Sequence, residues 1–417
     1  MKQHSFLTAL CLLFAAVPIT GQTIKSSMEF APSEHWVKPV EKPYREEICL
    51  NGTWAFAPVQ LPVGFKEGET PAPALPGVNE VTFSKTPIRI PSPWNVNSFA
   101  DKNGLGGDHL TYPSYPKEWE SIKMGWLQKK FTVPASWKGK RIQIHFEAVA
   151  GKADIYVNGK VVGDNFDIFM PFDIDITDAV KFGQENILNV GIQKSSLFDD
   201  RKSPLGRRTY QGGSFWGQHI AGIWQDVYLV ALPQTRVADV YIQPIVNKNT
   251  LEVEVTLRND ENKPVKVNIS AAAYPWISKA GKTVLTAANP SSQLGSQAAL
   301  QMPTQKVTIP AGKEIKTTLK TTVDNKLKLW SPSSPNLYGL VVKTSVNGKT
   351  NDSKYTRFGW RQTELKDGKF WLNGKPFVLK GDSWHYMGIP QMTRRYPWAW
   401  YTALRDANCN AVRLHAQ

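Results

Sequence analysis

The sequence contains few cysteines, and none of them is placed to build a disulfide framework. There are three in 417 residues, and Cys11 falls inside an apolar N-terminal run, which leaves Cys49 and Cys409 far apart along the chain. A fold held by disulfides needs a set of paired cysteines, so that class of protein is excluded. The two remaining thiols are expected to be small buried hydrophobic groups.

Several functional signatures are also missing. The chain has no glycine-rich phosphate loop, no His-Glu-x-x-His sequence and no closely spaced cysteine pair, so we predict no cofactor and assign no metal ligands. A structural ion on a loop is left open. The net charge is +15, but the lysines are scattered and long basic blocks are absent. Nucleic acid is therefore not an expected partner. A solvated positive surface explains the charge, with attraction to acidic polysaccharide as the alternative.

The N-terminus carries the pattern of an export signal. Lys2 and His4 precede an apolar run at 6–17, and the small residue Gly21 follows it. This order is typical of a cleaved signal peptide, and the run is too short for a membrane-spanning helix. We expect residues 1–21 to be removed and the mature chain to be secreted or periplasmic, with no membrane span. An uncleaved anchor is the alternative.

Short strands dominate the first half of the mature chain. Apolar and polar residues alternate at 142–146 and at 188–193, and Asn158-Gly159 between two apolar runs is a strong signal for a two-residue hairpin. No helical period is sustained in this region. The pattern predicts a β-sandwich of jelly-roll type over residues 22–233.

A second all-β unit is predicted over residues 234–357. Apolar residues alternate with Glu and Thr at 251–257, as in an antiparallel strand with one exposed face. Further short strands follow, with tight turns at Asn347-Gly348 and at 310–312, at the spacing of an immunoglobulin-like β-sandwich.

The class of structure changes from β to α/β near residue 358. A hairpin is expected over 370–379, and its second arm at 377–379 is apolar enough for a buried barrel strand. A helix is expected from Pro397, and 411–414 returns to strand. Strand, helix and strand in this order predict a parallel βαβ unit. A (β/α)8 TIM barrel needs about 250 residues, so residues 358–417 would form only its incomplete start.

The chain has 15 tryptophans, which is many for its length. Their flat apolar faces can stack on sugar rings, or they can pack the cores of the two sandwiches. For any single tryptophan we expect core packing, with sugar stacking as the alternative.

Ten short motifs occur in a fixed order along nearly the whole mature chain. They lie at residues 125–126, 131–134, 153–159, 171–177, 222–227, 329–332, 335–338, 358–361, 372–376 and 410–413. In this order they resemble glycoside hydrolase family 2, the group of β-galactosidases, β-glucuronidases and β-mannosidases. The resemblance implies a jelly-roll sugar-binding-type domain, an immunoglobulin-like domain and the start of a TIM-barrel catalytic domain.

The same resemblance implies an activity for the intact parent protein. Members of the family hydrolyse terminal β-glycosidic bonds of oligosaccharides or polysaccharides with retention, and a β-galactosidase-like activity fits best. The sugar and its linkage stay open, because the stretch from Gly381 to His385 and the placement of His415 both depart from the family pattern.

Five candidate substrate-binding residues follow from these positions. Asp382, Trp384 and His385 come after the first expected barrel strand, where sugar hydroxyls would be bound at the catalytic face. The alternatives are a loop-capping role for the polar pair and simple loop packing for Trp384. Arg413 lies within the second strand, where the family uses this residue to support the active-site network. His415 comes one residue earlier than in the family, which along a strand would turn its ring to the opposite face.

No catalytic residue is predicted within the chain. Retaining hydrolysis needs two carboxyl groups about 5–5.5 Å apart, and in the family both are Glu residues beyond the position of Gln417. The barrel portion here holds only Glu364, Asp367, Asp382 and Asp406. We therefore expect the chain to be inactive by itself.

The alternative is a noncatalytic exported carbohydrate-binding protein built from two β-sandwiches. Against it, a self-sufficient binding protein would gain nothing from an uncovered βαβ unit carrying Trp398, Tyr401 and Leu404. In either case the expected partner is an oligosaccharide or polysaccharide with a terminal β-linked sugar, and an oligomer is compatible with the sequence.

Overall fold

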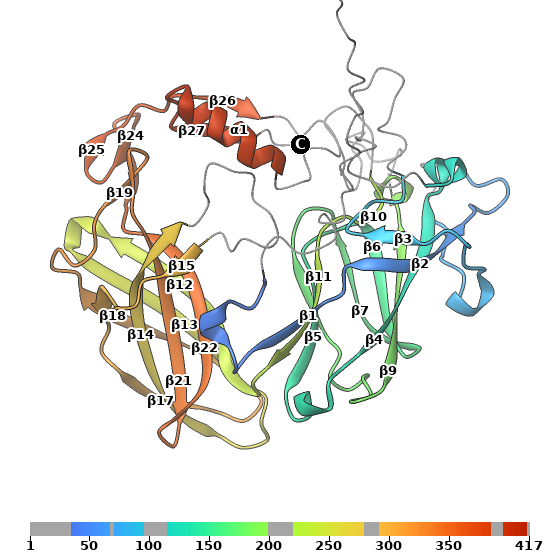
Figure 1. The fold of residues 1–417 in the computed structure, drawn as a ribbon, viewed down its shortest axis with the longest axis horizontal. Coiled ribbons are helices and arrows are strands. Elements are labelled where there is room, and N and C mark those ends of the chain that lie inside the picture. The colour runs from blue at the N-terminus through green and yellow to red at the C-terminus, as the bar shows by residue number, and fades with distance from the viewer. Residues whose placement is uncertain are drawn as a thin grey trace, which may run out of the picture.

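The protein is mainly β, as predicted from the sequence, and is arranged as two β-sandwiches followed by a small α/β unit (Figure 1). The computed structural model describes residues 35–66, 71–95, 115–198, 220–278, 292–384 and 395–414. The predicted signal peptide lies outside these ranges. Among the helices that are described, none is long and apolar enough to cross a membrane.

The first sandwich consists of a four-stranded and a seven-stranded sheet. The four-stranded sheet has the order β1 (Glu46–Cys49), β11 (Val227–Leu232), β5 (Arg141–Phe146) and β8 (Phe172–Asp175). The other sheet has the order β10 (Gly222–Ile223), β6 (Val149–Val157), β9 (Glu185–Gln193), β4 (Met124–Thr132), β2 (Gly52–Val59) and β3 (Ile88–Ile90), with β7 (Lys160–Asp167) paired to β6. Short 3-10 turns lie around them: η1 (Pro39–Glu41), η2 (Val78–Glu80), η4 (Lys117–Ser121), η5 (Ala135–Trp137) and η6 (Ser195–Phe198).

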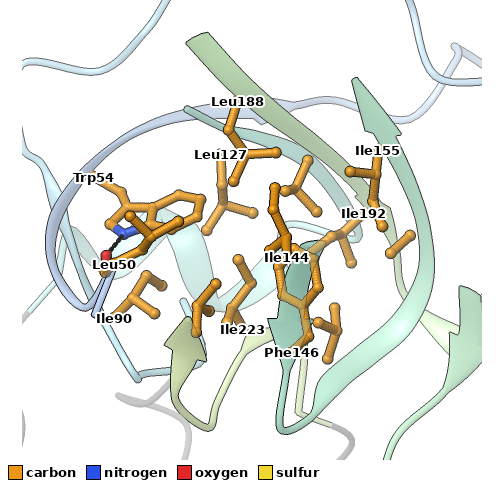
Figure 2. Packing of buried hydrophobic residues seen from close by; sticks show 14 of the residues in the cluster. Leu50, Trp54, Ile90, Leu127, Ile144, Phe146, Ile155, Leu188, Ile192 and Ile223 are labelled. Atoms are coloured by element: carbon orange, nitrogen blue, oxygen red, sulfur yellow. Dashed lines mark hydrogen bonds between the residues drawn. The ribbon is translucent and has the colours of Figure 1, made fainter. Parts of the chain in front are cut away.

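Apolar side chains from both sheets form the core of this sandwich (Figure 2). Trp54, Trp94 and Trp119 are buried in it. Burying an indole requires a partner for its N–H, and Trp54 Nε1 donates to the Leu50 carbonyl at 2.8 Å. These tryptophans therefore pack the core and are not available to stack on sugars.

The second sandwich has its own hydrophobic core. One sheet has the order β12 (Thr235–Ile245), β13 (Thr250–Asn259) and β18 (Glu314–Thr322). The other has the order β15 (Ser292–Leu294), β14 (Val265–Ser278), β21 (Leu337–Val346) and β22 (Lys349–Gly359), with β16 (Leu300–Gln301) and β17 (Gln305–Ile309) also paired to β14. The turn η7 (Val246–Lys248) joins β12 to β13, and β19 (Trp330–Ser331) pairs with β20 (Ser334–Pro335).

The Asn-Gly hairpins form where the sequence predicts them. Asn158 and Gly159 between β6 and β7 have φ of 53° and 82°, and Asn347 and Gly348 between β21 and β22 have φ of 49° and 79°. Two consecutive positive φ values define the type I′ turn, whose twist matches that of the flanking strands. These two turns fix the register of long strand pairs in both sandwiches.

A buried ion pair joins the segment before β1 to the second sandwich. Arg45 donates to Asp352 of β22 through Nε at 2.9 Å and Nη2 at 2.7 Å, and Asp352 also accepts the Val237 backbone N–H at 2.8 Å. Both side chains are almost fully buried. Glu41 accepts the Tyr355 N–H at 2.9 Å and so covers part of the β22 edge. The segment therefore ties the two sandwiches together.

Trp36 contributes to the same junction from the start of the described chain. Its ring lies 5.1 Å from the ring of His145 on β5 of the first sandwich. On the other sandwich, the Lys354 ammonium of β22 lies 5.1 Å from the Trp36 ring centroid. Burial lowers the pKa of Lys354, and the nearby charge of Arg45 acts in the same direction. The indole thus contacts both sandwiches.

The C-terminal unit begins with a small antiparallel sheet of β23 (Thr363–Lys366), β24 (Lys369–Leu372) and β25 (Lys375–Pro376). It continues with β26 (Gly381–Trp384), α1 (Arg395–Asp406) and β27 (Ala411–Leu414), where β26 and β27 pair in parallel as the βαβ pattern predicts. One expectation was wrong: 377–379 is not a buried strand. Val378 and Leu379 are 71% and 57% exposed, because no described element packs on them.

Candidate functional site

The parallel pair of β26 and β27 carries the predicted site residues that the structure describes. Asp382 and Trp384 lie within β26 and not after the strand as predicted, because the strand begins at Gly381 and not at 377. Gly381 allows the two backbones to approach: a Cβ at this position would lie 1.9 Å from the Ala411 carbonyl oxygen. Asn410 joins the starts of the strands, since its Oδ1 accepts the Lys380 N–H at 2.8 Å and its Nδ2 donates to the Val378 carbonyl at 3.0 Å. These contacts fix the register of the pair.

The register places Asp382 and Arg413 on opposite faces. Asp382 is opposite Val412, and Ser383 is opposite Arg413. Side chains of register partners share a face and alternate along each strand, so Arg413 lies with Ser383 while Asp382 points to the other side. The Asp382 carboxylate accepts its neighbour's N–H, that of Ser383, at 2.7 Å. Both Asp382 and Arg413 are exposed.

The other three candidates are only partly located. The backbone of Trp384 belongs to β26, but its side chain is outside the described structure, as are His385 and His415 altogether. Their roles in sugar binding stay predictions. Sequence reasoning missed Ser383 as the companion of Arg413. With Gly381 placed opposite Ala411, the alternation of side chains along the two strands puts Ser383 on the same face as Arg413.

Glu364, Asp367 and Asp406 lie in local structures away from the parallel pair. Glu364 accepts from Gln362 Nε2 at 2.6 Å, and Asp406 on α1 accepts from its neighbour Arg405. Asp367 has φ of 52° in the turn between β23 and β24. None of these lies at the C-terminal end of a parallel strand, where barrel active sites form. In the part of the chain that is described, no group of three or more His, Cys, Asp or Glu is placed to hold a metal ion.

His145 of β5 lies beside two carboxylates on the first sandwich. Its Nδ1 lies 2.8 Å from Asp173 Oδ1, and its Nε2 lies 3.5 Å from Glu147 Oε1 without hydrogen-bond alignment. Burial disfavours the charged ring, but the two carboxylates outweigh this and raise the pKa of His145 to about 9. A histidine that stays protonated at neutral pH cannot act as a general base. This cluster is a structural ion pair.

The two cysteines are less buried than the sequence predicts. Cys49 and Cys409 are free and half-buried. Burial raises the pKa of the Cys49 thiol to about 11, so the thiol stays protonated at neutral pH and is a poor nucleophile.

Comparisons with known proteins match both sandwiches. The model of the glycosyl hydrolases family 2 sugar binding domain matches residues 48–233, and that of glycosyl hydrolases family 2 matches residues 235–361. A β-galactosidase of Thermoanaerobacter pseudethanolicus is 30% identical over 281 residues, 66% of this chain and 33% of that protein. A β-glucuronidase of Formosa agariphila is 29% identical over 361 residues, 80% of this chain and 33% of that protein.

Solved structures share the fold. The crystal structure of a Bacteroides uniformis β-glucuronidase superposes with a TM-score of 0.64 at 22% identity, covering 89% of this chain and 40% of that one. The two matched domain models correspond to the two sandwiches of the structure. The chain belongs to glycosyl hydrolases family 2. It spans about one third of the length of the curated relatives named above.

Proposed function

We propose that this chain supplies the supporting sandwiches and the first substrate-facing strands of an exported, retaining β-glycosidase, and that by itself it does not cleave glycosides. The proposal rests chiefly on the placement of the carboxylates. Retaining hydrolysis uses one carboxyl group as nucleophile and a second, about 5–5.5 Å away, as acid and base. Of the carboxylates described from residue 358 onward, only Asp382 is on a strand of the parallel pair.

Asp382 is poorly suited to be the nucleophile. It already accepts the Ser383 N–H, and its face of the pair is opposite to that of Arg413. An arginine supports a neighbouring carboxylate by donating charge-assisted hydrogen bonds, and no such bond joins these two residues among the described contacts. We assign Asp382 to hydrogen bonding with the substrate or to capping of the loop after β26.

Arg413 is the residue on which substrate recognition would depend most. Its guanidinium is exposed on the same face as Ser383, so it is free to donate to sugar hydroxyls or to a carboxylate. The relatives include both β-galactosidases and β-glucuronidases. We propose a β-galactoside-like terminal unit, with a β-glucuronide as the alternative that an arginine donor also accommodates.

The proposal is tested on the purified chain with 4-nitrophenyl β-galactoside and 4-nitrophenyl β-glucuronide. Release of nitrophenol at the rate of the buffer blank is expected for both, and turnover that survives repurification contradicts the proposal. Calorimetry with a β-linked oligosaccharide tests the noncatalytic alternative. Binding that is tight and unaffected by Arg413→Ala would favour a sugar site on the sandwiches over one at the parallel pair.

A further inference from the structure

Three lysines of the second sandwich share an outward face of one sheet. Along β14, Val265, Val267 and Ile269 are buried while Lys266 and Ser270 are exposed, so even-numbered residues here point outward. The register places Lys306 of β17 opposite Asn268, and Lys343 of β21 opposite Ser270. Lys306 and Lys343 are exposed as well. We call Lys266, Lys306 and Lys343 the lysine face.

The spacing of the lysine face follows from sheet geometry. The three residues lie on the adjacent strands β17, β14 and β21, at levels two residues apart. With strands about 4.8 Å apart and a rise of about 3.4 Å per residue, their Cα atoms form a triangle with sides of roughly 8 to 15 Å. The shortest side matches the Debye length of about 8 Å at physiological salt and the longer sides exceed it, so the lysines repel one another appreciably only at low salt, where the Debye length is about 30 Å. One extended ligand is long enough to contact all three.

On the opposite sheet of the same sandwich, two lysines are paired with carboxylates. On β18, Lys316 lies 2.8 Å from Glu254 and Lys320 lies 2.6 Å from Glu252, both acids being on the neighbouring strand β13. By contrast, none of the three lysines of the lysine face forms an ion pair with any residue that the structure describes. The outward residues between them on these strands are Asn268, Ser270, Thr308 and Ser345, which are polar and uncharged.

We propose that the lysine face binds a linear acidic polysaccharide. Unpaired like charges on one face repel each other, and an anionic ligand that bridges them relieves this repulsion. Side-chain amides and hydroxyls between the lysines can donate to or accept from sugar hydroxyls. The face has no aromatic residue between the lysines on which a base could stack, which disfavours a single-stranded nucleic acid.

The position of the face suits a second contact with a long substrate. In Figure 1, β17 lies at the end of the second sandwich that is far from α1 and the β26–β27 pair. A polysaccharide held there would not block the end of the molecule where Arg413 lies. This inference concerns a different surface from the proposed glycosidase site and stands or falls independently of it.

The test compares two triple variants of the whole chain. K266Q/K306Q/K343Q removes the lysine face. K130Q/K316Q/K320Q removes the same number of positive charges from lysines that are already paired with Glu185, Glu254 and Glu252. All six positions are exposed on strands, so both variants should fold, which circular dichroism and the melting temperature check.

Binding is measured by affinity electrophoresis in gels containing polygalacturonate, heparin or neutral dextran. At low salt, the lysine-face variant should lose at least about tenfold in affinity for polygalacturonate and the control variant less than about twofold, with no retardation in dextran for any form. Stronger retardation by heparin would mean that sulfate is preferred to carboxylate. The proposal is overturned if the two variants lose affinity equally, if the wild-type chain is not retarded by either polyanion, or if duplex DNA is bound more tightly than both.

Discussion

Removing either partner of the Arg45–Asp352 pair is expected to destabilise the protein strongly. The side chains are 2% and 0% exposed, and two guanidinium–carboxylate hydrogen bonds of 2.9 and 2.7 Å join them. Arg45→Met keeps the length of the aliphatic chain but leaves Asp352 buried with only the Val237 N–H as a donor in the described contacts. Asp352→Asn keeps the shape and leaves Arg45 as the unpaired charge.

The expected cost of each single substitution is about 3–5 kcal/mol, because an uncompensated charge then stays buried. The double variant R45M/D352N should lose clearly less stability than the sum of the two single losses, because its second substitution removes the charge that the first one left buried and unpaired. A coupling energy on the order of 2 kcal/mol is expected for residues in direct contact. Lys130→Met is the control, because its pair with Glu185 is 62% and 58% exposed and such pairs contribute about 0–1 kcal/mol.

Equilibrium unfolding in urea, monitored by tryptophan fluorescence, measures these free energies. Limited proteolysis at Pro233–Gln234, between the sandwiches, reports separately on the junction. Because the pair joins the two sandwiches, the single variants should also lose cooperativity and show two transitions. The reasoning is refuted if each single substitution costs less than about 1 kcal/mol or if the two effects add. Either result would mean that water reaches the pair or that the junction does not depend on it.

Two further outcomes are expected from other parts of the molecule. The pKa of His145 is raised to about 9 from an ordinary 6.5. The protonated ring therefore stabilises the folded protein fully below about pH 6.5, and this stabilisation is lost as the pH rises through about 9. Because Asp173 and Glu147 are nearly half exposed, the free energy of unfolding should fall by about 1–2 kcal/mol. Urea titrations at both ends of this range measure it, and an equal loss in His145→Gln would assign the effect to another group. Gly381→Ala should separate β26 from β27, because the added Cβ would lie 1.9 Å from the Ala411 oxygen. Hydrogen exchange of the β27 amides should accelerate while the sandwiches keep their melting temperature. Amides of β27 that stay protected would show that the strands can shift to admit the methyl group.

Local patterns predicted the strands and turns of both sandwiches. The Asn-Gly pairs at residues 158 and 347 adopt the positive φ values that their hairpins require, and the alternation at 251–257 is that of a strand with one buried face. These features depend on residues adjacent in the chain. The parallel pairing of β26 and β27 was also predictable, because a strand, a helix and a strand leave few other arrangements.

Contacts between distant residues were not predictable from one sequence. Arg45 and Asp352 are separated by 307 residues, and neither lies in a motif that marks it as buried. The apolar stretch at 377–379 was wrongly assigned to a buried strand, because its composition suits burial whether or not an element covers it. The opposite faces of Asp382 and Arg413 depend on the register of the parallel pair, which the close approach of Gly381 to Ala411 determines.

Covalent trapping tests the central claim most directly, that this chain carries recognition residues but no catalytic nucleophile. A retaining glycosidase forms a glycosyl-enzyme ester on one carboxylate, and an activated 2-deoxy-2-fluoro-β-glycoside allows that ester to accumulate. The purified chain is incubated with the galactose- and glucuronate-configured reagents, and its intact mass is measured. The account predicts an unchanged mass with both reagents. A single adduct that maps to Asp382, Glu364 or another carboxylate of the chain, and that is absent after substitution of that residue by its amide, would contradict it.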